Sequence, residues 1–213
     1  MKEMDKMFES RDAHISIQQM HDFGITQLCI KPPQEIEKFR DEQLIQTEFL
    51  SKSLHICNVL GLLINTLKHE RDPLSGDSNI FGFTFKKADL NNPEFRLMQK
   101  CAFYAGLLLP FNGYEYTNSK KKPVTAVQHI LLESLKQSND VQKNVTLSLQ
   151  YLQKEMAMLC QKYSLDSVTA EELSSEQKLE IALALRQIGP YYGQISLLKI
   201  AEDYVSRIQP TLQ

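Results

Sequence analysis

The 213-residue chain contains no tryptophan, and glycine and proline are scarce at eight residues each. Few positions therefore interrupt a helical pattern, and the abundant leucine, glutamine and lysine lose little side-chain freedom in a helix. Hydrophobic residues make up 42% and charged residues 23% of the chain, which are ordinary values for a globular protein. This composition predicts a mainly helical protein that is long enough to bury a sizeable core.

The chain also lacks an excess of one charge sign, since its formal net charge is −2 at pH 7. A specific nucleic-acid binder normally carries a basic face, whereas this sequence has only short basic clusters. No uninterrupted apolar run reaches the roughly 18 residues of a membrane span. The first six residues include acids and lack the apolar segment of a signal peptide. We therefore expect a soluble protein with no nucleic-acid partner, no membrane span and no signal peptide.

No two cysteines form a C-x-x-C pair, which disfavours a redox motif or a zinc knuckle. The last three cysteines fall within helical apolar patterns, where we interpret them as small buried hydrophobic residues. Free thiols favour a reducing, cytoplasmic compartment, and the sequence leaves delivery into another cell open. The four cysteines are Cys29, Cys57, Cys101 and Cys160.

The longest helical pattern covers about residues 33–69. Pro33 suits the first position of a helix, and Glu35 and Glu37 follow in the first turn, where the helix dipole favours acids. Such a helix would outrun every other one in the chain. It is expected either to bend near residues 51–53 or to be covered in its first half by residues 1–31.

Two segments of similar composition are expected to form the centre of the fold. Residues 55–64 and 101–109 each contain a cysteine, a glycine and a leucine-rich run. A helix that is apolar on nearly every side must be buried, so the two segments should pack on each other. Gly61 and Gly106 would allow their backbones to approach closely.

The remaining apolar periodicities and start signals complete an all-α fold. We predict a single-domain antiparallel helical bundle of six or seven helices over residues 1–213, with two long loops at 70–91 and 110–122. Residues 25–30 are expected to be extended. Shorter helices are predicted over residues 10–22, 92–109, 123–135, 140–163, 175–188 and 194–208.

Short connections make neighbouring helices antiparallel, so the loops should gather at two ends of the bundle. One end would collect five aromatic residues, either as a lid over the core or as a patch that receives a partner. These candidate partner-binding residues are Phe81, Phe83, Phe85, Tyr191 and Tyr192. The other end would place residues 120–122, three lysines, opposite Glu171 and Glu172, as a solvated loop or a phosphate or lipid-headgroup contact.

Polar residues within the apolar centre have two interpretations. His55, Asn58 and Tyr104 could form hydrogen bonds between helices that fix the packing register. They could instead line a ligand pocket between helices, a common place for such sites. We treat these three as the ligand-pocket candidates.

No catalytic motif, Gly-rich phosphate loop or metal-ligand spacing is present in the sequence. His14 and His21 share a helical face but have no visible third ligand, so no metal and no cofactor are expected. The sequence predicts a non-enzymatic helical protein–protein interaction module, such as a bacterial effector or accessory protein. The alternative is a helical protein with an apolar small-molecule pocket between helices, which could be an enzyme.

Overall fold

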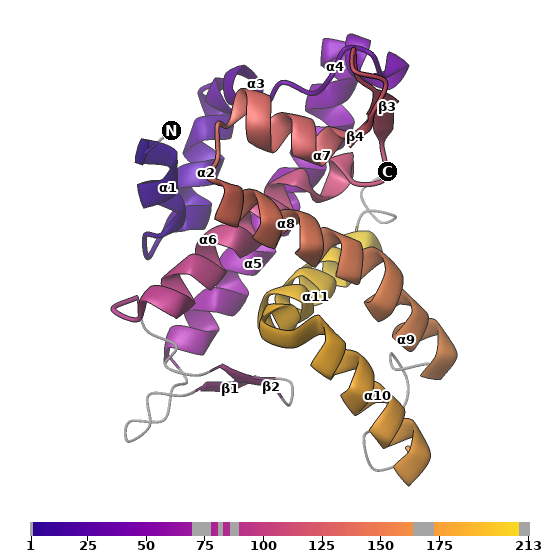
Figure 1. Cartoon of the computed structure of the whole chain (residues 1–213). Coiled ribbons are helices and arrows are strands. Elements are labelled where there is room, and N and C mark those ends of the chain that lie inside the picture. Colours follow the sequence, from indigo (N-terminus) through magenta and orange to yellow (C-terminus); the bar gives the residue numbers. More distant parts are fainter. Residues whose placement is uncertain (1, 70–77, 81–82, 86–89, 164–172, 209–213) are drawn as a thin grey trace.

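The computed structural model describes residues 2–69, 78–80, 83–85, 90–163 and 173–208 (Figure 1). Helices dominate these residues, and strands occur only as two short hairpins. The predicted all-α helical fold is therefore confirmed. Buried hydrophobic residues from the first to the last described helix form one core cluster.

The N-terminal region forms three helices, α1 (Lys2–Phe8), α2 (Ala13–Asp22) and α3 (Ile25–Cys29). The prediction of an extended segment at 25–30 is wrong. Gly24 adopts a left-handed conformation with a φ of 68°, which lets the chain leave α2 and begin α3 directly. In space, α1 contacts α6, whereas α2 lies on α5.

The long helix is continuous from Glu42 to His69 and consists of α4 (Glu42–Leu44), a π-helical segment (Ile45–Leu50) and α5 (Ser51–His69). The predicted start at Pro33 is wrong. Asp41 caps the true start, because its carboxylate accepts hydrogen bonds from the backbone amides of Gln43 (2.9 Å) and Leu44 (3.1 Å).

Within the part of the chain that the structure describes, this helix alone is long and apolar enough to cross a membrane. Half of its most apolar 18-residue window is buried inside the fold. Core helices of soluble proteins meet the same criteria of length and composition, so the finding is weak support for a membrane span.

The segment before the long helix is drawn into the core by an aromatic cluster. Phe39 lies in a 3-10 turn (Glu37–Arg40) and is fully buried. Its ring centroid lies 5.2 Å from that of Phe49, 5.5 Å from that of Phe111 and 5.1 Å from that of Tyr114. These contacts fix an irregular segment where the sequence pattern predicts a helix.

The central pair of helices is α5 and α6 (Pro93–Leu108). The hydroxyl of Ser53 donates a hydrogen bond to the carbonyl of Leu107 across the pair (2.6 Å). A Cβ at Gly106 would lie only 2.5 Å from Leu60 Cδ1, so the two helices approach closely here. At Gly61 the close neighbour is α2 and not α6, because a Cβ there would lie 2.2 Å from the ring of His14 on α2.

Both predicted loops contain a short antiparallel hairpin. β1 (Ser78–Ile80) pairs with β2 (Phe83–Phe85), and β3 (Glu115–Thr117) pairs with β4 (Pro123–Thr125). Pro123 therefore belongs to a strand, and the helix predicted to begin there starts three residues later.

The helix after β4 comprises α7 (Ala126–His129) and a π-helical segment (Ile130–Ser134). Thr125 and Gln128 form a capping box at its start. The helix therefore begins at this capping box, after the strand, and three residues later than the predicted start at Pro123.

The C-terminal half follows the predicted pattern closely. A continuous helix comprises α8 (Asn139–Tyr151), a π-helical segment (Leu152–Met156) and α9 (Ala157–Tyr163). It is followed by α10 (Ser175–Ile188) and α11 (Tyr192–Ile208). α11 packs on both α5 and α6, while α9 and α10 extend away from the other helices in Figure 1.

Candidate functional site

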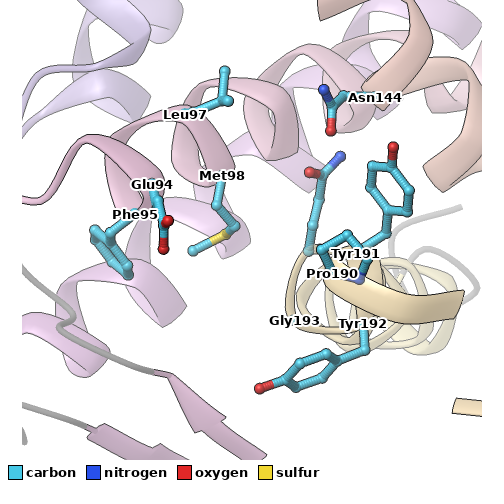
Figure 2. A pocket seen from close by; sticks show the side chains of 10 residues that line it. Glu94, Phe95, Leu97, Met98, Asn144, Pro190, Tyr191, Tyr192 and Gly193 are labelled. Atoms are coloured by element: carbon cyan, nitrogen blue, oxygen red, sulfur yellow. The ribbon is translucent and has the colours of Figure 1, made fainter. Parts of the chain in front are cut away.

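An open groove lies where the start of α6, the first part of α8 and the start of α11 meet (Figure 2). Its volume is about 610 Å³, within the range of small-ligand and peptide-anchor sites. The lining combines aromatic and aliphatic side chains with a few polar groups. It consists of Glu94, Phe95, Leu97, Met98, Asn144, Pro190, Tyr191, Tyr192, Gly193 and Gln194.

The α6 side of the groove is set by a strong helix start. Asn92 accepts a hydrogen bond from the backbone amide of Glu94 (3.1 Å), and Pro93 occupies the first turn. This start places Phe95 in the core and Met98 at its boundary, while Leu97 remains 39% exposed at the rim. The first turn of α6 therefore presents apolar side chains to the opening.

The opposite side is the elbow between α10 and α11, a 3-10 turn (Gly189–Tyr191). Gly189 has a φ of 61°, a conformation that favours glycine, and Pro190 then fixes the turn. The ring of Tyr191 lies 6.3 Å from that of Tyr151 on α8. In Figure 2 the ring of Tyr191 rises beside Asn144, whereas the ring of Tyr192 points away from it.

The floor of the groove is held by a buried polar contact. The amide of Gln194 on α11 donates a hydrogen bond to the hydroxyl of Ser148 on α8 (2.8 Å), and both residues are buried. Gly193 beside it is also buried. The contact therefore ties α11 to α8 before any ligand binds, which lowers the entropic cost of binding.

The lining contains no histidine, cysteine or lysine, and its one carboxylate belongs to Glu94. Among all the residues that the structure describes, no three histidine, cysteine, aspartate or glutamate side chains are grouped so as to hold a metal ion. The arrangement is suited to binding by apolar contact, with amide groups available for hydrogen bonds.

The structure places the predicted aromatic residues in two situations. Tyr191 and Tyr192 are half-buried and line the groove. Phe83 and Phe85 belong to β2, whose backbone lies against α11, whereas Phe81 lies outside the described residues. At this groove Asn144 of α8 meets the elbow and the first turn of α6.

The ligand-pocket candidates do not come together. His55 and Asn58 line a small pocket of about 140 Å³ between α5 and α11. The amide of Asn58 donates a hydrogen bond to Gln18 on α2 (3.2 Å). Tyr104 lies elsewhere, on α6, so the three candidates do not share this pocket.

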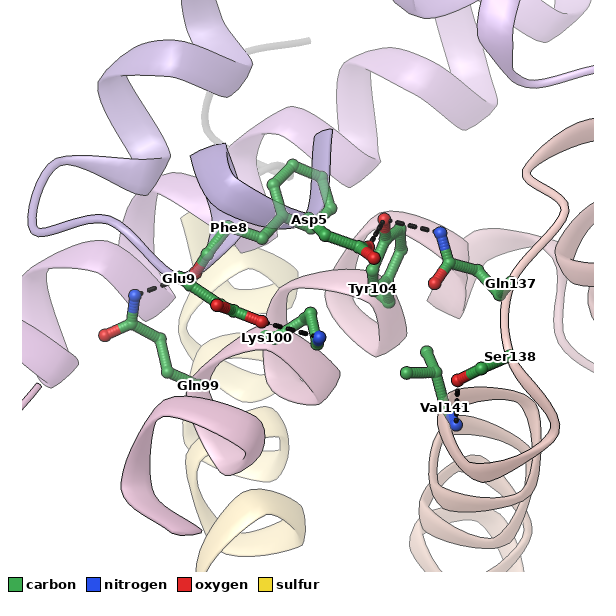
Figure 3. Close-up of polar contacts among 9 residues, drawn as sticks. All are labelled: Asp5, Phe8, Glu9, Gln99, Lys100, Tyr104, Gln137, Ser138 and Val141. Carbon is green, nitrogen blue, oxygen red and sulfur yellow. Dashed lines mark hydrogen bonds and ion pairs between the residues drawn. The ribbon is translucent and has the colours of Figure 1, made fainter. Parts of the chain in front are cut away.

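Tyr104 is instead the centre of a polar network under α1 (Figure 3). Its hydroxyl donates to the carboxylate of Asp5 (2.7 Å) and accepts from the amide of Gln137 (2.8 Å). Burial and the hydrogen bond to Asp5 raise the pKa of the Tyr104 phenol above its ordinary value. The phenol thus stays neutral and joins three segments, a role in packing register.

Two further contacts attach the same N-terminal segment to α6. The amide of Gln99 donates to the backbone carbonyls of Phe8 (2.8 Å) and Ser10 (2.7 Å). Lys100 forms an ion pair with Glu9 (2.6 Å), as Figure 3 also shows. None of these pairs has a local sequence signal, because the partners lie about ninety residues apart.

A second opening of about 710 Å³ lies between residues 27–35, the start of the long helix and His129. Its walls are rich in amide and charged side chains, and the ring of His129 is hydrogen-bonded to the hydroxyl of Tyr116 (2.8 Å). The more polar lining gives fewer apolar anchors for a partner than the groove beside Tyr191.

The cysteines show no reactive environment. None of the four forms a disulfide, and Cys57 and Cys101 are buried in the core. Burial raises the pKa of the Cys57 thiol and raises that of Cys101 to about 12. A thiol that remains protonated is a poor nucleophile and a poor metal ligand.

The predicted second cluster lies partly outside the described residues. Residues 120–122 are exposed and join β3 to β4, with Lys121 at a φ of 57° in the turn. Glu171 and Glu172, their predicted acidic neighbours, are not among the residues that the structure describes.

The groove residues that the sequence did not single out come from three elements: Phe95 and Met98 from α6, Asn144 from α8 and Gln194 from α11. The helix start at Asn92 was a signal for the first two. Comparison of the chain with protein-family models, curated proteins and solved structures finds no match in any of the three.

Proposed function

We propose that this chain is a non-enzymatic helical module that binds a segment of another protein in the groove between α6, α8 and the elbow. The observation that carries the proposal is the convergence of Phe95, Met98 and Tyr191 on one open groove of about 610 Å³. Aromatic residues and methionine are enriched at protein interfaces, and aromatic side chains contribute much of the binding energy.

The chemistry of the lining defines the partner. Apolar walls favour one or two large aliphatic or aromatic side chains as anchors. Glu94 is the single charged group in the lining and favours a lysine or arginine beside those anchors. We therefore infer a short apolar segment with an adjacent basic residue.

The four free cysteines support a reducing compartment for the protein. The same setting would make intracellular proteins, including those of another cell after delivery, the source of the partner. A bacterial effector or accessory role remains compatible with this proposal.

The alternative is a small apolar molecule in the same groove, and its volume supports this reading because ligand pockets commonly enclose about 300–1,000 Å³. Native mass spectrometry of the purified protein distinguishes the two. A co-purifying mass that disappears in a Leu97→Asp variant would favour the small molecule.

The partner hypothesis is tested with a photoreactive amino acid placed at Leu97 on the groove rim. Leu132, an exposed leucine on the π-helical segment Ile130–Ser134, is the matched control position. We expect cross-links from position 97 to a defined peptide with an apolar anchor and a basic neighbour, and none to that peptide from position 132.

Affinity for that peptide then gives the quantitative test. We expect Tyr191→Ala to weaken binding about 30-fold, as for an interface hot spot of about 2 kcal/mol. Leu132→Asp should leave affinity unchanged, and thermal melting must show that both variants remain folded. Equal affinity in wild type and Tyr191→Ala would remove the groove from the interface.

A further inference from the structure

Helix α10 has two faces of different character. Its inner face carries Ile181 and Ala184, which pack against the core, and the buried Ile188. Its outer face carries Leu179 and Leu183, which are 62% and 50% exposed. Two large exposed leucines one turn apart form an apolar surface that the chain does not cover.

Charged residues continue this outer face in both directions. Glu176 precedes Leu179 by three residues, and Arg186 follows Leu183 by three. The spacing of three, four and three places all four residues on one stripe of the helix. Both charged side chains are exposed.

Neither charge has a hydrogen bond or ion pair with another residue that the structure describes. Among the ion pairs of the described residues, α10 contributes only Glu180, which binds Lys162 and Tyr163 of α9. That contact lies off the outer stripe and anchors α10 to α9. The stripe Glu176–Leu179–Leu183–Arg186 is thus presented outward on a fixed helix.

The stripe is complementary to itself when read in the opposite direction. Glu176 and Arg186 each lie five residues from position 181, and the two leucines each lie two residues from it. If two antiparallel copies of α10 are related by a two-fold axis that passes beside position 181, Leu179 of one copy lies opposite Leu183 of the other. Each Glu176 then faces an Arg186.

We propose that α10 is the interface of a two-fold dimer, in which the stripe Glu176–Leu179–Leu183–Arg186 packs antiparallel on the same stripe of a second copy. Closed two-fold symmetry uses one self-complementary patch on both partners, which is the property of this stripe. The three–four spacing also suits the packing of helices at about 20°. The two apolar pairs lie at the centre, and the ion pairs flank them.

The contact is small compared with a standard interface of about 1,200–2,000 Å². The dimer should therefore be reversible and concentration-dependent. This proposal is independent of the groove beside Tyr191, since the stripe occupies the opposite face of α10 from the core.

A different explanation of the charges gives a contrasting prediction. Glu176 lies in the first turn of α10 and Arg186 in the last, where each also favours the helix dipole. If the two charges acted only through the helix dipole, the charge-swapped double variant Glu176→Arg/Arg186→Glu would show a larger loss than either single variant. The dimer predicts instead that this double variant recovers association.

Sedimentation velocity of the full chain over a hundredfold concentration range tests the proposal. Wild type should approach twice the chain mass of 24.5 kDa. Glu176→Arg and Arg186→Glu should each weaken dimerisation at least tenfold, because like charges then meet twice. An equimolar mixture of these two variants should form a heterodimer, since every facing pair is again opposite in sign.

Lys178→Glu is the matched control, because it makes the same charge change as Arg186→Glu on an exposed position of α10 that lies off the stripe. It should dimerise like wild type. A wild-type chain that stays monomeric at the highest concentration would overturn the proposal. So would a mixture that fails to associate although each variant melts like wild type.

Discussion

His14 packs directly against Gly61, where a Cβ on residue 61 would not fit. The imidazole of His14 lies where a Cβ of residue 61 would project, and its Nδ1 atom is buried without a hydrogen-bond partner. Burial lowers the pKa of His14, the nearby charge of Lys68 lowers it further, and the charge of Asp12 opposes both. The ring is therefore neutral in the folded state at neutral pH.

This lowered pKa predicts a pH dependence of stability. Between the folded pKa of His14 and its ordinary value of 6.5, the unfolded chain binds more protons than the folded chain. The free energy of unfolding should therefore rise with pH through this window. This gain should be lost again on acidification below about 6.5. Urea unfolding of wild type at pH 7.5 and pH 5.5 measures this loss.

The matched variant for that experiment is His14→Gln, which keeps a polar side chain but cannot titrate. The difference in stability between wild type and His14→Gln should shrink as the pH falls. A difference that stays constant from pH 7.5 to pH 5.5 would show that His14 does not contribute.

Capping residues mark the start of two helices whose beginnings the sequence pattern misplaced. Asp41 starts the long helix, and Thr125 with Gln128 starts α7. In both places a proline earlier in the chain, Pro33 or Pro123, offers a competing start signal. The structure follows the cap and uses the proline segment for tertiary contacts or a strand.

Asp41→Ala, which removes the cap, should therefore destabilise the protein by about 0.5–2 kcal/mol. Asp41→Asn should retain most of the stability, because its side-chain oxygen can still accept from the amides of Gln43 and Leu44. Glu37→Ala, near the start predicted from the sequence, should change stability by less than about 0.5 kcal/mol. Chemical denaturation of the three variants gives the comparison.

The elements that sequence patterns predicted best are those with long, regular apolar stripes. The stripe from Val141 to Tyr163 and the strong start at Asn92 gave α8, α9 and α6 with nearly correct ends. Residues 33–41 were mispredicted because Ile36 and Phe39 fit a helical spacing, whereas Phe39 is placed by its contacts with distant aromatic rings. The spacing of apolar residues along the sequence carries no information about such a contact between distant residues.

The candidate site shows the same division. The antiparallel rule predicted that the loops at 70–91, 138–140 and 189–193 would gather at one end, and the groove brings Tyr191 and Tyr192 beside the first turn of α6 and Asn144 of α8. The rule could not separate Tyr104 from His55 and Asn58, because all lie in the central apolar segments. Which side of a buried helix a polar residue faces depends on neighbours far away in the chain.

At the scale of the whole molecule, the N-terminal helix is joined to the core by polar contacts as well as by burial. Phe8 is fully buried beside the ring of Tyr104, at a centroid distance of 4.6 Å. The hydroxyl of Tyr104 then connects Asp5 to Gln137. A single oxygen atom thus joins α1, α6 and the segment before α8.

Tyr104→Phe should destabilise the protein by about 1–3 kcal/mol, because Asp5 loses the hydrogen bond from the hydroxyl and the buried amide of Gln137 keeps only its longer bond, to the carbonyl of Leu135 (3.3 Å). Amide hydrogen exchange should become faster in α1 than in α11, since α1 loses its bond through Asp5. Tyr204→Phe is the matched control, because Tyr204 is 55% exposed on α11. Equal exchange rates in α1 of both variants would contradict this role for Tyr104.

The attachment of α1 has a consequence for how the chain acquires its fold during synthesis. Asp5 and Tyr104 are 99 residues apart, so α1 leaves the ribosome long before its partner on α6 exists. At about 5–20 residues per second, that interval is about 5–20 s. Throughout it, Met4 and Phe8 have no α6 to cover them. Helix α1 must therefore wait for its docking surface, and chaperones that recognise short apolar segments have this time in which to bind it.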